Sequence, residues 1–100
     1  MPGFSTEINH SLGQAEATSR LKGFVERAQE RFGEHVSSVD GRWTDNVLDF
    51  ALTVTGMNIK GTLTVEESRV RVAGSLPLIA MPFRGKVEKS IADEIRQELS

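Results

Sequence analysis

The residues that could perform chemistry are few and dispersed along the chain. The two histidines, His10 and His35, lie far apart in sequence, and no H-x-x-x-H or H-E-x-x-H spacing is present. Zinc sites often take two ligands from such a local motif. The chain has no cysteine, which excludes disulfides, thiolate metal ligands and a cysteine nucleophile. We therefore expect two loop histidines and no metal site.

The densest group of carboxylates is Asp40, Asp45 and Asp49. A general acid–base pair needs carboxyl groups buried in a cleft, where their pKa values are shifted. The hairpin predicted below instead puts Asp40 and Asp49 on its solvent face, with Arg42 opposite Asp49 as a cross-strand ion pair. No G-x-S-x-G, phosphate-binding or dinucleotide-binding glycine pattern occurs. The sequence thus predicts no catalytic residue and no bound cofactor, and we expect a protein that is not an enzyme.

Residues 36–76 predict a four-stranded antiparallel meander. Alternating runs are separated by three dipeptides suited to two-residue hairpin loops, Asp45-Asn46, Gly56-Met57 and Glu67-Ser68. All three loops place the apolar residues on the same face, and a one-residue slip at any of them would turn a strand over. The registers that follow pair Trp43 with Leu48, Val39 with Leu52, Leu52 with Gly61, Phe50 with Leu63, Leu48 with Val65, Leu63 with Val72, and Val65 with Val70.

A strand and a first helix precede the meander. Residues 4–10 alternate as a strand does, and Ser11 with Gln14 has the spacing of a capping box. Apolar residues then recur at helical spacing up to Gly33, which stands where a C-cap glycine is expected. This pattern predicts one continuous helix, in which Gly23 costs roughly 1 kcal/mol relative to alanine. Its predicted apolar face consists of Ala17, Leu21, Phe24, Val25, Ala28 and Phe32.

A second helix ends the chain, from Pro82 or Phe83 to Leu99. Two amphipathic helices and a sheet with one apolar face bury their apolar surfaces only if both helices lie on that face. We predict a single α+β domain over residues 1–100, in the order β-α-β-β-β-β-α, with two helices packed on one face of an antiparallel sheet. The first strand is expected antiparallel beside the fifth; a parallel pairing beside the second is the alternative. The helical residues expected to cover the sheet include Val87, Ile91 and Ile95.

Gly61 and Gly74 face each other on the inward side of the predicted sheet. The missing side chains make a hollow beneath the helices. We favour a bulky ring, that of Phe24, Phe32 or Phe83, as the group that fills it, because small domains seldom leave core volume empty. The alternative is a ligand cavity between sheet and helices.

The linker from Leu78 to Phe83 is apolar and is not explained by either periodicity. It could join the core under the sheet edge. We predict instead that part of it stays exposed and contacts a partner, because two prolines keep it out of sheet and helix. Phe83 is the residue of this linker most expected in the core. The candidate contact residues are Leu78, Ile79, Met81 and Phe83.

The composition is that of an ordinary globular domain, with 38% hydrophobic and 26% charged residues. A formal charge of −2 and the lack of a basic stripe disfavour nucleic-acid binding. No apolar run reaches the roughly 20 residues that span a bilayer, and the N-terminus does not have the pattern of a signal peptide. We expect a cytoplasmic protein. The predicted outer face is small and flat at Ala51, Thr62 and Ala73, which would suit a face-to-face homodimer.

Several short motifs, in order, resemble one known family. They are His10-Ser-Leu-Gly13, Trp43-x-x-Asp45-x-x-Leu48-x-Phe50, Gly61-Thr-Leu-x-Val65, Val70-x-Val72, and Leu76-Pro-Leu followed by Pro82-Phe-Arg-Gly85-Lys-Val-Glu88. Over residues 5–99 the chain is similar to the polyhydroxyalkanoic acid system family, small bacterial proteins whose genes lie near those for polyhydroxyalkanoate storage polymer. The element order is also similar to the TATA-binding-protein-like and helix-grip folds, some of which hold lipids between helix and sheet.

The resemblance implies a granule-associated accessory role in polyhydroxyalkanoate metabolism. The leading hypothesis is a non-enzymatic protein that contacts the granule surface or a granule protein. The alternative is a carrier that binds a small apolar ligand, such as an acyl chain or lipid, between sheet and helices. A void of several hundred Å³ under the sheet would favour the carrier, since ligand sites usually measure about 300–1,000 Å³.

Overall fold

The computed structural model describes residues 3–34, 36–54 and 56–100. His35 and the side chains of Ala28 and Phe32, for which the sequence makes predictions, lie outside the described part. No helix in the described part of the chain is both long enough and apolar enough to cross a membrane.

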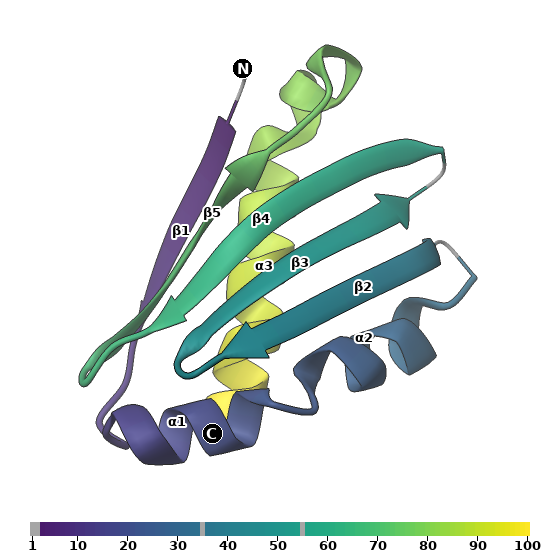
Figure 1. Ribbon diagram of the computed structural model, residues 1–100. Helices are drawn as coiled ribbons and strands as arrows, with labels where there is room; N and C mark the ends of the chain where they lie inside the picture. The colour runs from purple at the N-terminus through teal and green to yellow at the C-terminus, as the bar shows by residue number, and fades with distance from the viewer. Residues whose placement is uncertain (1–2, 35, 55) are drawn as a thin grey trace.

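Five antiparallel strands form one sheet in the order β1-β5-β4-β3-β2 (Figure 1). Strand β1 lies antiparallel beside β5, with Phe4 opposite Gly74 and Ile8 opposite Val70. The predicted placement of the first strand is therefore confirmed. The strands are β1 (Gly3–Asn9), β2 (Val36–Thr44), β3 (Val47–Val54), β4 (Met57–Val65) and β5 (Arg69–Ser75).

The helices lie on one face of this sheet, as the apolar pattern predicts. Helix α3 runs behind the strands in the view of Figure 1, with α1 across its C-terminal end and α2 beside β2. Arg20 of α1 donates from Nη1 to the Leu99 carbonyl oxygen at 3.2 Å, which ties α1 to the end of α3. The helices are α1 (Gln14–Leu21), α2 (Phe24–Phe32) and α3 (Arg84–Leu99), and the short 3₁₀ helix η1 (Leu78–Phe83) precedes α3.

The first predicted helix is in fact two helices, because helical structure is interrupted at Lys22 and Gly23. Gly23 has φ −95° and ψ 7° and forms the N-cap of α2. A Cβ at Gly23 would lie 2.3 Å from Nη1 of Arg27, so the guanidinium occupies the space that a side chain would take. The same guanidinium donates from Nη2 to the Arg20 carbonyl oxygen at 2.8 Å. The glycine therefore permits a bend in which Arg27 satisfies the end of α1.

The predicted cap of the first helix is also different. Gly13, with φ 83°, is the N-cap of α1, and Ser11 is not. The Gln14 N–H donates instead to Oε2 of Glu67 at 3.3 Å, and the Gln14 side-chain amide donates to the Val65 carbonyl oxygen at 3.0 Å. The start of α1 is thus held by the β4–β5 hairpin, a long-range contact that a local capping box does not contain.

Two of the three hairpin registers are as predicted, and the third differs by two residues. In the β3–β4 pair Leu52 lies opposite Ile59, Phe50 opposite Gly61, and Leu48 opposite Leu63. Met57 pairs with Val54 and so belongs to strand β4 rather than to the loop. A shift by an even number of residues keeps each side chain on its face, and so the predicted apolar face survives the error.

The changed register alters the outer face of the sheet. Thr62 lies between Asp49 on β3 and Ala73 on β5, whereas Ala51 lies opposite Lys60. The predicted row of small residues is therefore interrupted by charged groups. A homodimer through this face stays a prediction, but its physical motive is weaker.

Three glycines and two phenylalanines form one row that crosses all five strands. Gly41 pairs with Phe50, Phe50 with Gly61, Gly61 with Gly74, and Gly74 with Phe4. A Cβ at Gly61 would lie 2.6 Å from the Phe50 ring, and one at Gly74 would lie 2.7 Å from the Phe4 ring. The space over Gly61 and Gly74 is thus occupied by the rings of Phe50 and Phe4 from neighbouring strands, and not by Phe24 or Phe83, two of the rings expected from the sequence.

Candidate ligand cavity

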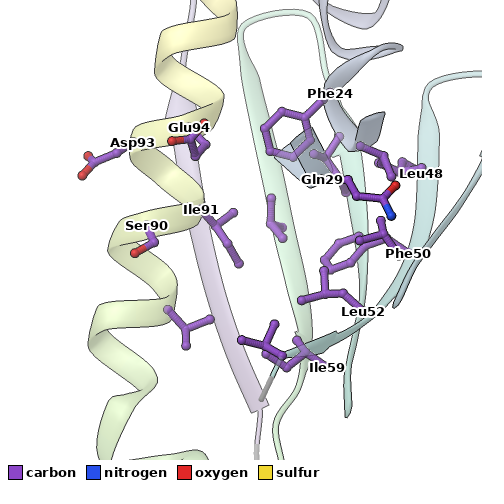
Figure 2. A pocket seen from close by; sticks show the side chains of 16 residues that line it. Phe24, Gln29, Leu48, Phe50, Leu52, Ile59, Ser90, Ile91, Asp93 and Glu94 are labelled. Atoms are coloured by element: carbon purple, nitrogen blue, oxygen red, sulfur yellow. The ribbon is translucent and has the colours of Figure 1, made fainter. Parts of the chain in front are cut away.

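A cavity of about 430 Å³ lies between the sheet and the helices α2 and α3. Figure 2 shows Phe50, Leu52 and Ile59 on its sheet side and Ile91 of α3 pointing toward them. Its apolar wall is formed by Phe24, Val25, Val39, Leu48, Phe50, Leu52, Val54, Ile59, Leu63, Val72, Val87 and Ile91.

The cavity explains why several residues predicted for the core are only half-buried. The predicted core includes Phe24, Phe50, Leu52, Val87 and Ile91, and all five are of intermediate exposure. All five also line the cavity. Leu48, Leu63 and Val72 also line the cavity but are buried, as are the members of the predicted core outside its lining, namely Leu21, Val65, Val70 and Ile95. The apolar pattern of the sequence is therefore correct in kind, but part of the apolar surface faces a void instead of a neighbour.

The cavity lies between two helices that cover different parts of the same face of the sheet. Helix α2 packs against the edge strand β2, where Val25 covers Gly41 so closely that a Cβ there would lie 2.9 Å from Val25 Cγ2. Helix α3 lies on the same face of the sheet, toward the opposite edge, and contacts β1. The inner surface of β3 and β4 between these two helices is left partly uncovered.

Polar residues contribute a small part of the cavity lining. They are Gln29 on α2 and Ser90, Asp93 and Glu94 on α3. In Figure 2 the Asp93 side chain points away from the apolar wall. Few polar groups face a large apolar wall, and this combination is typical of sites that bind apolar molecules.

Ion pairs connect the two helices beside the cavity. Arg27 Nη2 lies 2.7 Å from Oε2 of Glu98, and this hydrogen-bonded carboxylate raises the pKa of Arg27. Arg31 pairs with Glu94 and also donates to Oε1 of Gln97 at 2.9 Å. Glu94 itself lines the cavity, so these bridges join α2 to α3 at its border.

His10, considered above for metal chemistry, has a structural partner at each ring nitrogen. His10 accepts the Leu12 N–H at Nδ1, at 3.2 Å, and its Nε2 lies 3.0 Å from the Glu66 carbonyl oxygen. A neutral imidazole with its proton on Nε2 satisfies both contacts. Within the described residues no three His, Cys, Asp or Glu side chains are grouped so as to hold a metal ion. His10 therefore acts as a link between the end of β1 and the β4–β5 loop.

The aspartates do not meet in a cleft. Asp40 and Asp49 are exposed, and Asp45 has φ 53° in the β2–β3 turn. Arg42 lies opposite Asp49 as predicted, but the Asp49 carboxylate accepts a hydrogen bond from Thr62 Oγ1 at 3.0 Å. The interaction that the structure gives to Asp49 is thus with β4 rather than the predicted ion pair.

The apolar linker forms η1 and does not avoid helical structure, contrary to prediction. Pro77 is its N-cap and Pro82 lies inside it, and the Ala80 N–H donates to the Pro77 carbonyl oxygen at 2.9 Å. Ala80 is buried and Met81 packs against the core. The exposed side chains are Leu78 at 78%, Ile79 at 76% and Phe83 at 54%. Met81, and not Phe83, is the member of the predicted contact set that reaches the core.

This architecture, with a long C-terminal helix held against an antiparallel sheet and an apolar cavity between them, defines a helix-grip-like α+β domain. Among solved structures, the chain is similar to TTHA0849 from Thermus thermophilus, with a TM-score of 0.59 and 14% identity over 98% of this chain and 94% of that one. It also aligns with Ara h 8.0201, with a TM-score of 0.45 and 9% identity over 97% of this chain and 96% of that one. At these identities the first similarity shows the fold alone.

The sequence identifies the family. Residues 5–99 match the family described as "putative polyhydroxyalkanoic acid system protein". The chain belongs to this family, as the motifs from His10 to Glu88 predict. The comparison with curated proteins returned no match.

Proposed function

We propose that the chain is a non-enzymatic accessory protein of the polyhydroxyalkanoate system that binds an apolar ligand, such as an acyl chain, between its helices and its sheet. The observation that carries this proposal is the cavity of about 430 Å³ with its apolar wall. That volume lies in the range of about 300–1,000 Å³ that is usual for small-molecule sites. A void of several hundred Å³ under the sheet is the feature expected of a carrier, and so the volume supports the carrier hypothesis over granule contact.

A ligand would gain affinity mainly from apolar burial. Each Å² of apolar surface removed from water contributes about 25 cal/mol, from which the cost of immobilising the ligand must be subtracted. The wall residues on β3 and β4 are held in a paired sheet, so their positions are fixed before a ligand binds. Reversible binding of an uncharged or weakly polar chain is the expected behaviour.

The test measures binding of phenylnaphthylamine, an uncharged dye that fluoresces when it leaves water. Ile91→Phe adds volume from α3 into the cavity, and Ile79→Phe makes the same change on the exposed surface of η1. We expect wild type and Ile79→Phe to bind alike, and Ile91→Phe to bind at least about tenfold more weakly, a difference of about 1.4 kcal/mol. Thermal unfolding of each variant checks that the fold is retained. Equal binding by the two variants would exclude the cavity as the site.

A second candidate function is contact with the polyhydroxyalkanoate granule or with a granule protein. The observation that favours it is the exposure of Leu78, Ile79 and Phe83 on η1. Three large apolar side chains on one short segment are unusual on the surface of a soluble domain and are typical of interaction sites. Met81, which was expected to take part, packs against the core instead.

Partition onto isolated granules tests this second candidate. In the variant Leu78→Ser with Ile79→Ser, both changes lie at exposed positions and should leave thermal stability unchanged. We expect wild type to sediment with granules and the double variant to remain largely in the supernatant. If the folded double variant sediments as wild type does, η1 is not the contact.

A further inference from the structure

We propose that η1 and the first turns of α3 form a docking surface for an anionic lipid layer. This surface, called the η1 tip below, consists of the apolar residues Leu78, Ile79 and Phe83 and the basic residues Arg84, Lys86 and Lys89. The inference rests on the second candidate function and extends it by naming the chemistry of the surface that is contacted.

The η1 tip lies at one end of the molecule. In Figure 1 η1 follows the last strand of the sheet and sits at the end of α3 remote from the C-terminus. Apart from its contact with α3, it has few neighbours among the described elements. Ala80 is 2% exposed and anchors the segment, while Leu78 and Ile79 are 78% and 76% exposed. The anchored backbone thus presents its apolar side chains outward, with no loss of internal packing if they enter another phase.

The charges beside these apolar groups have one predominant sign. Residues 76–89 contain the basic side chains of Arg84, Lys86 and Lys89 and one acidic side chain, Glu88, although the whole chain has a formal charge of −2. The three basic residues are exposed. None of them forms an ion pair with another residue in the described part of the chain. The η1 tip therefore has a local positive charge that the protein itself leaves unneutralised.

Glu88, the acidic exception, is hydrogen-bonded to the edge of the sheet. Its Oε2 accepts a hydrogen bond from the Ser5 N–H of edge strand β1 at 2.8 Å. The carboxylate is therefore directed toward the sheet. The N-terminal end of α3 adds a partial positive charge of its own, which acts in the same direction as the three basic side chains.

Apolar side chains flanked by basic residues fit a lipid layer with negative headgroups. The apolar groups enter the boundary between headgroups and acyl chains, and the cations remain at the level of the headgroups. A bare polyester surface would take the apolar residues out of water, but it has no anionic groups to bind the three basic side chains. Binding to a protein partner would be lost when that partner is digested by protease, whereas binding to a lipid layer would not.

The experiment measures cosedimentation of the full chain with vesicles of phosphatidylcholine alone and of phosphatidylcholine mixed with phosphatidylglycerol. We expect binding to the anionic vesicles, weak binding to the neutral ones, and a decrease as salt rises because salt screens the headgroups. Each basic residue near an anionic surface contributes roughly fivefold in affinity, so Arg84→Gln with Lys86→Gln and Lys89→Gln should bind about a hundredfold more weakly. Lys22→Gln, at the exposed junction of α1 and α2, is the control and should bind as wild type.

Parallel measurements with granules separate the two proposals. If wild type and the triple variant bind lipid-free polymer particles equally and neither binds vesicles, granule contact stands and the lipid inference is overturned. If binding occurs only to granules that retain their proteins, and is lost after protease treatment, the partner is a protein and the lipid inference is again overturned. Binding to neither vesicles nor granules would overturn both. Unchanged melting temperatures confirm that the variants are folded.

Discussion

Leu63 and Thr62 are neighbours on β4 whose side chains point to opposite faces of the sheet. Leu63 is 1% exposed and packs in the core, whereas Thr62 is half-exposed on the outer face. Leu63→Ala should lower the free energy of unfolding by about 2–5 kcal/mol, because it removes a buried side chain and leaves a void. Thr62→Ala should cost about 1 kcal/mol or less, through loss of its hydrogen bond to Asp49. Urea denaturation measures both, and similar losses would contradict the assignment of faces.

Glu66 is the centre of a cluster of ion pairs in the β4–β5 hairpin. Its carboxylate pairs with Arg69 at 2.6 Å and with Arg71 at 2.6 Å, and the hydrogen bond from Arg69 is the main cause of its lowered pKa. A carboxylate with a lowered pKa stabilises the folded state above the ordinary glutamate pKa, and this contribution is lost as the pH falls through the lowered value.

The expected result is a pH-dependent effect of Glu66→Gln. The variant should melt below wild type at neutral pH, and the difference should shrink in acid, below the ordinary glutamate pKa of about 4.3. Glu30→Gln, at an exposed position on α2, is the matched control. A difference between wild type and Glu66→Gln that is constant over this pH range would show that the ion pairs do not cause it.

Individual side chains were predictable where burial alone decides their position. Leu48, Leu63 and Val72 follow from alternation, since only one face of each strand can be buried. The partner of Asp49 was missed because the predicted β3–β4 register puts Thr64 opposite it, whereas the observed register puts Thr62 there. The exposure of Phe83 was not predictable either. Its position one helical turn before Val87 favours burial, but Phe83 ends η1 and its side chain is exposed.

At the scale of elements, the row of glycines and phenylalanines fixes how closely the strands can approach. Gly74→Ala would bring a Cβ to within 2.2 Å of the Lys60 carbonyl oxygen, a backbone atom that can move only with its strand. We expect a loss of about 1–3 kcal/mol in the free energy of unfolding, as in other overpacked sites.

Gly85→Ala provides the contrasting change in the same protein. Gly85 lies in the first turn of α3, and a Cβ there meets nothing within 4 Å. Alanine should therefore leave stability unchanged or increase it by up to about 1 kcal/mol, because it is the better helix former. Thermal or urea unfolding of the two variants measures the contrast. A destabilised Gly85→Ala together with a neutral Gly74→Ala would contradict this description of the sheet.

Strands were more predictable than helices for a physical reason. Strand faces depend on parity, which tolerates the two-residue error in the β3–β4 register. Helix continuity depends on a local balance, and the apolar spacing of the first helical segment gives no sign of the break at Gly23. The one available signal was the glycine itself, whose cost in a continuous helix is roughly 1 kcal/mol. Recognising it as a junction would have separated α1 from α2.

At the scale of the whole molecule, the cavity results from elements that are each ordinary. The strands supply an apolar face. Helix α2 covers this face near β2 and α3 covers it near β1. The bridges from Arg27 to Glu98 and from Arg31 to Glu94 connect the two helices. The sequence predicted the apolar surface and raised a cavity as an alternative, but it located that cavity at Gly61 and Gly74. Neither glycine lines the observed cavity, although Phe50, which pairs with Gly61, does; the extent of the cavity depends on how the helices are placed.

The central claim, that the cavity holds an apolar ligand, is tested most directly by nuclear magnetic resonance of methyl groups during titration with phenylnaphthylamine. The methyl groups of Ile59, Leu63 and Ile91 line the cavity, whereas those of Leu78 and Ile79 lie on the exposed surface of η1. The proposal predicts saturable shifts and direct contacts between the dye and the first group, with the second group unchanged. Shifts confined to Leu78 and Ile79, with the methyl groups of Ile59, Leu63 and Ile91 unaffected at saturation, would contradict it.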